Sequence, residues 1–407
     1  MKNPAIGSII NGYTIGDNLH VGGMANGYVA KSSTGQKVFF KAYKSPSVAI
    51  GWFKKYVAYQ KTLSERVNQP SLRRFCVQLL DAFVFKYGSD TFYQVYEFIE
   101  GGHDMGTLLE KFQKRPKEVS WEQRTIMARV LMAGIHNLHE QKIVHGDLKP
   151  ANLQMLIDPT ITAGYQLKLI DMDFSLLSDK VAPWHGVAPY VGTPRYFSPE
   201  HLRGETPVTA SDIFTCGIIL YELLGGGHPY ATDDDAEYKT KVADYKVTLP
   251  KLLGTITDDR GTRNLAETLH KCLSPDATKR PTAQEVNNAL NGRMVPPPKA
   301  PPEITVNSQQ IKLVDNAGVA LSLNITGRIG KQLLKKFGEH SQFAADHQFA
   351  LEKRDAGWIL IPQVDSPNHT MYNNEVASKP IKLKSGDTIA IGSRKSGKII
   401  LPLRVEF

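Results

Sequence analysis

The strongest chemical signal in the sequence is a polar cluster between His145 and Asn152. Asp147 can accept the proton of a substrate hydroxyl, and Lys149 can steady a transferring phosphate. Asn152 offers an oxygen ligand for a metal ion, and Asp171, about twenty residues further on, supplies a carboxylate suited to Mg²⁺. Phosphoryl transfer needs phosphates held, their charge neutralised and an acceptor hydroxyl aligned, so this spacing predicts that chemistry.

The segments before this cluster have the patterns of a sheet and a helix. Residues 12–45 alternate apolar and polar side chains around glycines, which predicts strands and hairpins. Residues 46–68 have helical periodicity, and residues 75–100 return to strand character. From Gly106 onward the pattern is helical.

One helix start is readable directly. Ser120 followed by Gln123 predicts a capped N-terminus. The apolar residues beyond it recur at helical spacing: Ile126, Val130, Leu131, Ile135 and Leu138.

The C-terminal quarter differs in pattern from the rest. Residues 291–303 are rich in proline, which predicts an extended, semi-rigid linker. Residues 304–407 contain short alternating runs broken by Gly, Asn and Asp. We therefore expect a separate β-sandwich of about 100 residues.

At the polar cluster the chain resembles the eukaryotic-like (Hanks-type) Ser/Thr protein kinases of bacteria, over about residues 12–290. The resemblance implies an α+β, two-lobed kinase domain at 1–290, with an N-lobe of about 1–99 and a C-lobe of about 100–290. It implies ATP and Mg²⁺ as cofactors. Asp147 matches the catalytic base, Lys149 the phosphate-steadying lysine, and Asn152 and Asp171 the metal ligands.

The resemblance also implies a nucleotide site before the cluster. Lys41 matches the strand lysine that contacts the α- and β-phosphates, and Tyr96 falls at the gatekeeper position. Glu97 and Ile99 match the hinge that meets adenine. The expected nucleotide-binding residues are Val21, Gly22, Gly23, Val29, Lys41, Gln60, Glu97 and Ile99.

Residues after the cluster match supporting parts of the family. Asp212 is expected to prop the catalytic loop, and Arg280 to pair with Glu200. Ser/Thr specificity rests on Lys149 and on Thr193 in its Gly-Thr-Pro context. Thr193 and Ser178 are the candidate autophosphorylation sites.

Two departures concern the nucleotide site. The glycine loop keeps Gly22 in the middle but has His20 and Ala25 where the first and third glycines are expected. Backbone amides of Gly22 and Gly23 can still cap phosphates. Gln60 occupies the slot of the helix glutamate, where it can hydrogen-bond Lys41 but not neutralise it.

Two further departures concern the catalytic and metal-binding segments. Gly146 stands where many kinases carry an arginine that reads an activation-loop phosphate, which predicts that such phosphorylation is not the main switch. Asp173 replaces the glycine of Asp-Phe-Gly. It is a candidate metal ligand, or a residue that locks the loop, and the sequence leaves both open.

Two alternatives compete with a protein kinase. Small-molecule phosphotransferases of the aminoglycoside and choline kinase type are similar at His145–Asn152 and at Asp171–Asp173, but they leave the segments 192–200, 211–214 and 279–281 unexplained. A pseudokinase scaffold is favoured by the altered glycine loop and Gln60. Retention of the lysine, base and metal-ligand positions argues against it.

The C-terminal segment contains Arg328-Ile329-Gly330-Lys331, His347 at a Ser-x-x-His position, and Leu383–Asp387 before an apolar strand. On these motifs, residues 304–407 resemble a forkhead-associated (FHA) domain, and the resemblance implies recognition of a phosphothreonine-containing partner. Lys331 stands where the phosphate-reading arginine is expected, and a lysine binds phosphate only as a point charge. The candidate phosphopeptide residues are Arg328, Lys331, Ser341, Asn368 and Asn373. A degenerate module that docks an unmodified partner is the alternative.

Composition bounds the partners and the compartment. Three scattered cysteines and an N-terminus without a leader pattern predict a cytoplasmic protein, with no membrane attachment. The net charge of +9 comes without a basic helix, so nucleic acid is not the expected partner. We expect protein substrates and, by resemblance, a cognate PP2C-type phosphatase.

Overall fold

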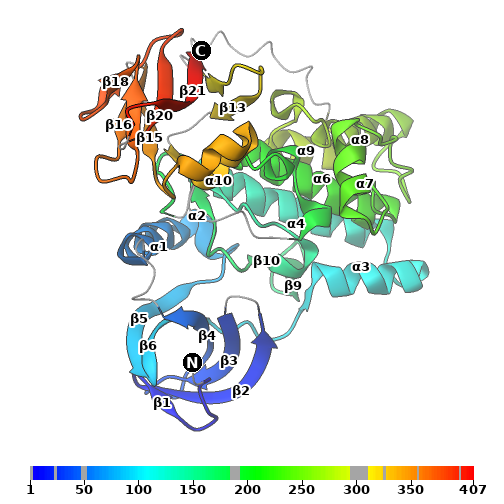
Figure 1. Ribbon diagram of the computed structural model, residues 1–407. Helices are drawn as coiled ribbons and strands as arrows, with labels where there is room; N and C mark the ends of the chain where they lie inside the picture. The colour runs from blue at the N-terminus through cyan, green and yellow to red at the C-terminus, as the bar shows by residue number, and fades with distance from the viewer. Residues whose placement is uncertain are drawn as a thin grey trace. The chain divides into compact units, whose positions relative to one another are not determined.

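The computed structural model describes residues 3–22, 25–46, 53–183, 193–293, 310–323, 327–354, 357–393 and 396–407. The chain divides into two compact units, Met1–Gln141 with Pro150–Asp173, and Lys142–Lys149 with Phe174–Phe407. Helices α3 and α4 thus group with the N-terminal sheet in the first unit, and α5–α9 belong to the second unit. Figure 1 labels the elements, and each unit is described separately below.

Within the described residues, the first unit contains a curled six-stranded antiparallel sheet, a three-stranded sheet of the order β10-β9-β7, and the helices α1 to α4. Its strands are β1 (Ile9–Ile10), β2 (Tyr13–Val21), β3 (Ala25–Lys31), β4 (Lys37–Pro46), β5 (Leu79–Tyr87), β6 (Ser89–Glu97), β7 (His103–Asp104), β9 (Leu153–Ile157) and β10 (Tyr165–Leu169). Its helices are α1 (Phe53–Val67), α2 (Pro70–Arg73), α3 (Met105–Lys114) and α4 (Trp121–Glu140), with 3₁₀ turns η2 (Pro116–Glu118) and η3 (Pro150–Asn152).

The six-stranded sheet has the order β1-β2-β3-β4-β6-β5 and curls around an aromatic core (Figure 1). Phe40 and Tyr93 are buried there, with ring centroids 5.2 Å apart, and Phe83 lies 5.6 Å from Tyr93. Successive side chains of a strand face opposite sides, so Phe39 and Lys41 lie on the other face from Phe40. The sheet thus presents Lys41 away from its own core.

Helix α1 lies within the predicted helix of residues 46–68. Its buried face includes Gln60, Leu63 and Val67, as the periodicity predicted, together with Tyr56 and Tyr59. Gln60 is 4% exposed, so its carboxamide needs partners inside the protein.

Helix α4 begins where the sequence predicted. The Ser120 hydroxyl accepts from the Gln123 amide, and the Gln123 side chain accepts from the Ser120 amide, so the capping box is confirmed. Leu131, Ile135 and Leu138 are fully buried, whereas Ile126 and Val130 are only partly buried. The helix packs on β10, where Gly134 allows Leu167 to approach closely.

The second unit begins with short elements around the polar cluster and continues with helices. Its elements up to residue 293 are β8 (Ile143–Val144), β11 (Leu176–Leu177), η4 (Pro194–Tyr196), α5 (Pro199–Leu202), α6 (Thr209–Gly225), α7 (Asp235–Ala243), α8 (Asp259–Cys272), η5 (Ala277–Lys279) and α9 (Ala283–Leu290). Helix α6 is buried from Ser211 to Leu224 and forms the centre of this region.

The C-terminal domain, residues 310–407, consists of two antiparallel sheets. Its elements are β12 (Ile311–Val314), β13 (Ala320–Leu323), β14 (Gly327–Ile329), α10 (Lys331–Leu334), η6 (Lys335–Phe337), η7 (Glu339–Phe343), β15 (Phe349–Arg354), β16 (Gly357–Pro362), β17 (His369–Tyr372), β18 (Glu375–Val376), β19 (Ile381–Lys382), β20 (Thr388–Gly392) and β21 (Ile399–Glu406).

The two sheets have the orders β13-β12-β21-β20-β17-β18 and β14-β15-β16-β19. One hydrophobic cluster draws side chains from both, including Ile311, Phe349, Trp358 and Val405. This is the two-layered all-β arrangement expected of a sandwich, with the short helices α10, η6 and η7 added between β14 and β15. The linker predicted at 291–303 lies largely outside the described residues.

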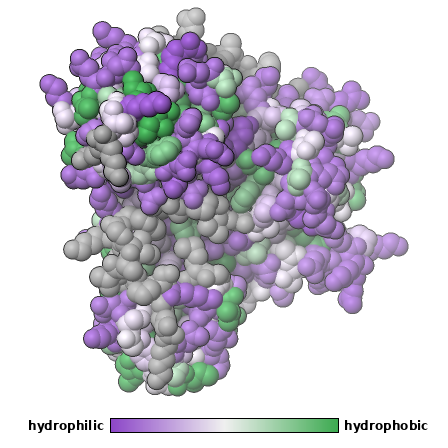
Figure 2. Space-filling model, viewed as in Figure 1, coloured by the Kyte–Doolittle hydropathy of each residue, from purple (hydrophilic) through white to green (hydrophobic). Residues whose placement is uncertain are grey.

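The three cysteines are free and buried. Within the described ranges, no helix combines the length and apolar character that crossing a membrane requires. On the face shown in Figure 2, hydrophilic side chains dominate, and hydrophobic ones form small separate areas.

Candidate active site

Lys41 is held by two carboxylates of the first unit. Its Nζ lies 2.7 Å from Asp171 Oδ1 and 2.6 Å from Asp173 Oδ2. Burial lowers the pKa of Lys41, but the charges of Asp173 and Asp171 outweigh it and raise that pKa above its ordinary value. The lysine is therefore a fixed cation next to the predicted metal ligand, as contact with phosphates requires.

Asp171 and Asn152 are brought together by the backbone. The Ile170 amide donates to the Asn152 carbonyl at 3.1 Å, directly before Asp171. Asp171 itself has a left-handed φ of 59°, a strained conformation that typically occurs at functional sites. Its side chain is 40% exposed, and its Oδ1 accepts from Lys41.

This pair fits Mg²⁺, which proteins usually hold through one or two side-chain oxygens together with waters and phosphate oxygens. Among the described residues, no group of three or more His, Cys, Asp and Glu side chains could form a metal site by itself. Asp171 and Asn152 would hold the ion, and the nucleotide would complete its coordination.

Asp173 has a different environment from the metal ligand that the sequence suggested. It is 3% exposed, and its Oδ2 accepts from Lys41 and from the Tyr43 hydroxyl. Its Oδ1 accepts from the Tyr96 hydroxyl at 3.1 Å. Protein donors thus contact both oxygens of Asp173, and its role as a metal ligand stays a prediction.

Gln60 also has a different partner from the one expected. Its Nε2 donates to the Asp173 backbone carbonyl at 2.7 Å. The hydrogen bonds of Lys41 go to Asp171 and Asp173, so the expected Gln60–Lys41 bond is not among those of the described residues. Gln60 thus lies on the buried face of α1 and bonds the backbone of Asp173.

The pairing of β3 with β4 gives a second way to align the glycine loop with the kinase pattern. Strand β3 pairs Gly27 with Lys41 and Val29 with Phe39. A Cβ at Gly27 would lie 2.5 Å from the Phe39 ring, so this position requires a glycine. In the kinase pattern G-x-G-x-x-G-x-V, Gly22, Gly27 and Val29 then fall on the first glycine, the third glycine and the valine.

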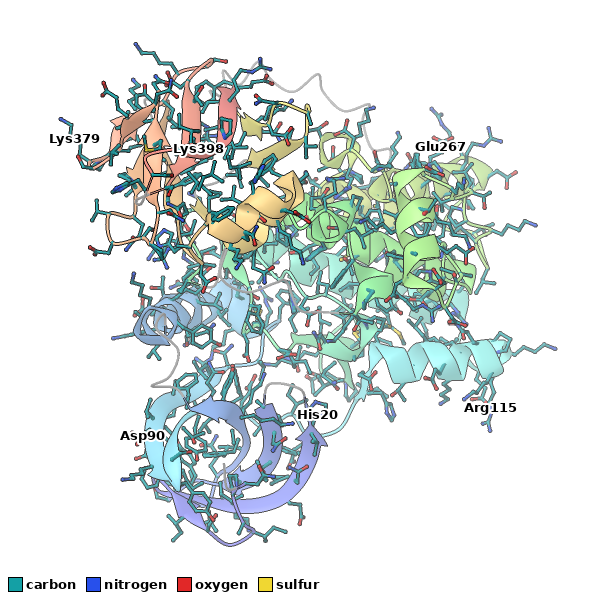
Figure 3. All side chains as sticks on the ribbon, viewed as in Figure 1. His20, Asp90, Arg115, Glu267, Lys379 and Lys398 are labelled. Atoms are coloured by element: carbon teal, nitrogen blue, oxygen red, sulfur yellow. The ribbon has the colours of Figure 1, made fainter. Side chains whose placement is uncertain are left out.

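The start of this loop is a tight turn. The Gly22 amide donates to the Ala25 carbonyl at 3.0 Å, so it is not free to cap a phosphate in this conformation. A Cβ at Gly22 would lie 2.9 Å from His20 Nε2, and Figure 3 shows His20 at the end of β2. Val21 is 70% exposed, and Gly23 lies outside the described residues.

The predicted hinge residues lie at and just beyond the end of strand β6. Val38–Glu97 is the last pair of β4 and β6, so Ile99 lies beyond the strand pairing, where its backbone can meet a base. The Glu97 amide donates to the Gln78 carbonyl, and its carboxylate accepts from Lys168 at 2.6 Å. These bonds fix the start of the hinge.

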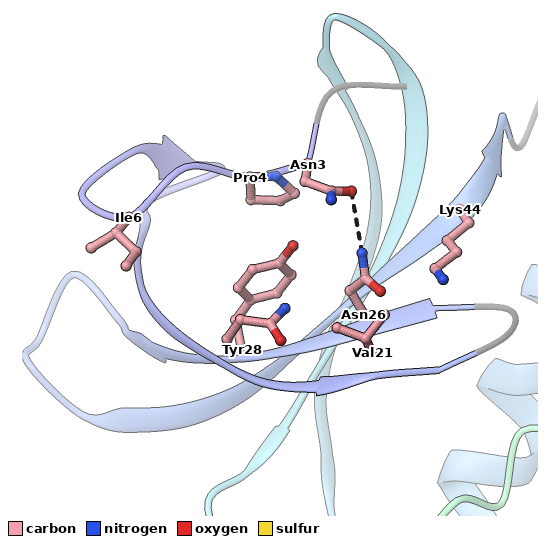
Figure 4. Close-up of a pocket in the computed structure, with 8 residues that line it drawn as sticks. Asn3, Pro4, Ile6, Val21, Asn26, Tyr28 and Lys44 are labelled. Carbon is pink, nitrogen blue, oxygen red and sulfur yellow. Dashed lines mark hydrogen bonds between the residues drawn. The ribbon is translucent and has the colours of Figure 1, made fainter.

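A cavity of about 390 Å³ in the first unit is a separate feature (Figure 4). It is lined by Asn3, Asn26, Tyr28 and Lys44 among others. Tyr28 pairs with Phe40 and shares its face, so the cavity lies on the core side of the sheet and not on the Lys41 side. It is therefore not the nucleotide site.

The second unit contains the predicted base. Lys149 Nζ lies 3.2 Å from Asp147 Oδ2, and the Asp147 side chain is 14% exposed. The buried carboxylate of Asp212 accepts from the amides of His145 at 2.8 Å and Gly146 at 3.1 Å. The expected role of Asp212 in holding this loop is confirmed.

Gly146 has a structural reason to be glycine. Its φ is 76°, in the left-handed region that side chains disfavour. Its carbonyl lies 2.9 Å from His201 Nε2, and His201 stacks on Phe197 with centroids 5.2 Å apart. Burial lowers the pKa of His201, so the imidazole is neutral. A neutral histidine thus links the loop to α5, which sequence reasoning missed.

Glu200 and Arg280 form a buried pair, as predicted. Two guanidinium nitrogens donate to the two carboxylate oxygens, each at 2.9 Å. Burial would raise the pKa of Glu200, but the hydrogen bonds and charge of Arg280, with Ser211 and Ser198, lower it to about 2. The pair fixes α5 against the α6 region.

The candidate phosphorylation sites differ in exposure. Ser178 is exposed, and its amide donates to the Lys142 carbonyl. Thr193 is half-buried, and its carbonyl accepts from the Tyr196 amide. Ser178 is thus the more accessible hydroxyl.

Only some of the candidate phosphopeptide residues in the C-terminal domain lie near one another. The Lys331 amide donates to the Ala345 carbonyl, and Asn368 Nδ2 donates to the Phe343 carbonyl, so Lys331 and Asn368 flank the same segment. Ser341 belongs to this segment but is 5% exposed. Arg328 is half-buried within β14.

Asn373 is separate from this group. It lies in the β17–β18 turn with a φ of 46°, and its side chain bonds Asp387 and the Thr388 amide. Strand β17 lies between Asn368 and Asn373. At roughly 3.3 Å per residue, the two backbone positions are about 16 Å apart along the strand. Asn373 is therefore a turn residue at some distance from Asn368, and its place among the phosphopeptide residues stays a prediction.

Comparison with known proteins points to one family. The family described as "Protein kinase domain" matches residues 13–290, more than half of the chain. Similar proteins include "Probable serine/threonine-protein kinase mkcD" of Dictyostelium discoideum, 27% identical over 54% of this chain and 30% of that protein. Myosin light chain kinase 3 of Mus musculus is 28% identical over 56% of this chain and 26% of its own length.

Serine/threonine-protein kinase Nek10 of Homo sapiens is 26% identical over 72% of this chain and 24% of its own length. The chain therefore spans about a quarter to a third of the curated relatives that it matches.

Proposed function

Because the chain belongs to the protein kinase family, we propose that it transfers the γ-phosphate of ATP to serine or threonine hydroxyls of proteins. The observation that carries this proposal is the loop of residues 145–149, where a base and a lysine lie side by side. Asp147 and Lys149 are 3.2 Å apart, and Asp212 holds the backbone before them. The family match supports a protein substrate over the small-molecule alternative.

The kinase-matched residues of each unit have distinct roles in the proposed reaction. Asp147 accepts the proton of the substrate hydroxyl, and Lys149 steadies the transferring phosphate. Lys41 contacts the α- and β-phosphates. Asp171 and Asn152 would hold Mg²⁺, which supplies charge neutralisation when bound.

Phosphate transfer from labelled Mg-ATP tests the proposal. Wild-type protein is expected to label itself or a generic basic substrate, and Asp147→Asn is expected to lose that label. Asp244→Asn, which removes an exposed carboxylate paired with Lys246, is the matched control and should label as wild type does. Mass spectrometry then shows whether Ser178 or Thr193 is marked.

A nucleotide-binding scaffold is the second candidate. Phe39 stands at the alanine of the V-A-I-K pattern, and its ring fills the space over Gly27. A bulky residue there favours weak nucleotide binding. If neither wild type nor Asp147→Asn carries label, and Mg-ATP still raises the Tm, the scaffold replaces the kinase.

For the C-terminal domain we propose an FHA-like role in docking a phosphothreonine-containing partner. Support comes from Lys331 and Asn368, which flank one loop segment at the same end of the domain. Titration with a phosphothreonine peptide should show binding that Lys331→Ala weakens and Lys379→Ala leaves unchanged. Equal binding of the unphosphorylated peptide, or none below millimolar concentration, would reject this role.

A further inference from the structure

A buried cluster surrounds the carboxylate of Asp173 in the first unit. Lys41 and the Tyr43 hydroxyl donate to Oδ2, and the Tyr96 hydroxyl donates to Oδ1. Asp173 is 3% exposed. A buried carboxylate is tolerated when it is paired and hydrogen-bonded, and here Lys41 supplies the pairing charge.

Helix α1 contributes no acid to this cluster. The position expected for the pairing glutamate is Gln60, and the only acidic residue of α1, Glu65, is exposed. Gln60 instead donates to the Asp173 carbonyl at 2.7 Å. The negative charge usually supplied by the helix has therefore moved to the segment after Asp171, and the helix residue supports that segment.

We propose that Asp173 is the positioning residue of Lys41, supplying the counter-charge that the helix glutamate supplies in other protein kinases, with Gln60 bracing its backbone. As a statement about phosphate contact by Lys41, the proposal rests on the proposed function. One short segment then carries both the predicted metal ligand, Asp171, and the residue that positions Lys41, Asp173. Pairing of Lys41 no longer requires an acid on α1.

A double-mutant cycle on the unliganded protein tests the pairing. Wild type, Lys41→Met, Asp173→Asn and the double variant are compared by Tm. Each single change leaves a buried group without its partner, so we expect the double variant to lose less Tm than the two single losses added together. Additive losses would overturn the proposal.

Nucleotide affinity shows whether Asp173 positions Lys41 or only stabilises the fold. By calorimetric titration with Mg-ADP, Asp173→Asn should weaken binding about tenfold in wild type, yet change it little in the Lys41→Met background. If Asp173→Asn lowers Tm but leaves the Mg-ADP affinity unchanged, the residue is structural only and the proposal fails. Asp81→Asn is the matched control, because Asp81 also accepts a tyrosine hydroxyl in the same sheet.

Relocating the charge gives the sharpest comparison. Asp173→Gly should reduce kcat by about 100-fold, since a displacement near 1 Å can cost that much. Adding Gln60→Glu in the same chain should restore at least part of the loss, whereas Gln60→Asn should restore none. Lack of any rescue, with the double variant folded, would contradict an exchange of roles.

The proposed function and the assignment of Asp173 are contradicted by different results. If wild type binds no Mg-ADP and transfers no phosphate, the proposed function falls, and the Tm cycle still decides whether Asp173 and Lys41 act as a pair. If wild type is active but the cycle is additive, the function stands and the assignment of Asp173 falls.

Discussion

Removal of Arg280 should destabilise the second unit more than removal of any exposed cation. The guanidinium is fully buried and donates to both oxygens of Glu200, to the Ser274 carbonyl and to the Ala210 carbonyl. Arg280→Met would leave the carboxylate of Glu200 buried without its counter-ion. Breaking such a pair from one side typically costs about 3–5 kcal/mol.

The pKa of Glu200 gives an independent magnitude. A fall from an ordinary 4.5 to about 2 corresponds to about 3 kcal/mol of stabilisation by its surroundings. A folded-state pKa below the unfolded value contributes stability that is present above pH 4.5. That contribution is lost as pH falls from 4.5 through about 2. Arg280→Met should therefore differ most from wild type near neutral pH and converge with it in acid.

Scanning calorimetry between pH 7 and pH 3 measures both effects. At neutral pH a loss of about 3–5 kcal/mol corresponds to a Tm decrease of roughly 6–20 °C for a unit of this size. Lys246→Met, which removes an exposed cation bound to Asp244, should change the Tm by little. The double variant Glu200→Gln/Arg280→Met should recover part of the loss, because no buried charge is left alone.

Two results would refute this reasoning. One is a Tm decrease for Arg280→Met no larger than that of Lys246→Met. The other is a wild-type–variant difference that stays constant between pH 5 and pH 3, since the stability would then not come from the charge of Glu200.

Three further changes have defined outcomes. Gly27→Ala places a Cβ 2.5 Å from the Phe39 ring, so we expect about 1–3 kcal/mol of destabilisation by calorimetry, and less in a Phe39→Ala background. Burial raises the pKa of Glu222 to about 7, so the contribution of this group to the Tm should fall as pH rises from 4.5 through 7, and the difference in Tm between wild type and Glu222→Gln should change with pH in that direction. Burial lowers the pKa of His201, so the contribution of this group to stability should fall as pH drops below 6.5, and the difference between wild type and His201→Gln should change in the opposite direction; a difference that does not vary with pH in either variant contradicts the assignment.

The sequence was most informative where chemistry and spacing coincide. Asp147 and Lys149 are neighbours within one short loop, so their proximity follows from the sequence alone. The capping box at Ser120 and Gln123 is equally local. The pairing of Glu200 with Arg280 joins residues 80 apart, and it was predicted only through the resemblance to kinases.

The sequence was least informative where partners are distant and the family pattern is broken. Asp173 bonds Tyr43 across 130 residues, and no spacing rule links the two. One usable signal was present: Tyr43 is two residues after Lys41 on the same strand, so both side chains share a face. Gly22 can be aligned with either of two glycines of the kinase pattern, and counting back from Val29 instead of forward from His20 finds Gly27 at the third glycine.

The departures from the kinase pattern occur with partners that compensate for them. A neutral Gln60 accompanies an acidic Asp173, and the two are bonded to one another. Gly146, which lacks the usual arginine, has its carbonyl held by His201. Such pairing would not be expected if these segments were no longer under functional constraint, because each substitution would then lack a compensating partner. In each unit, the altered kinase segment is therefore better explained as one stabilised by a different set of contacts, and loss of one partner should be more damaging than joint replacement of both.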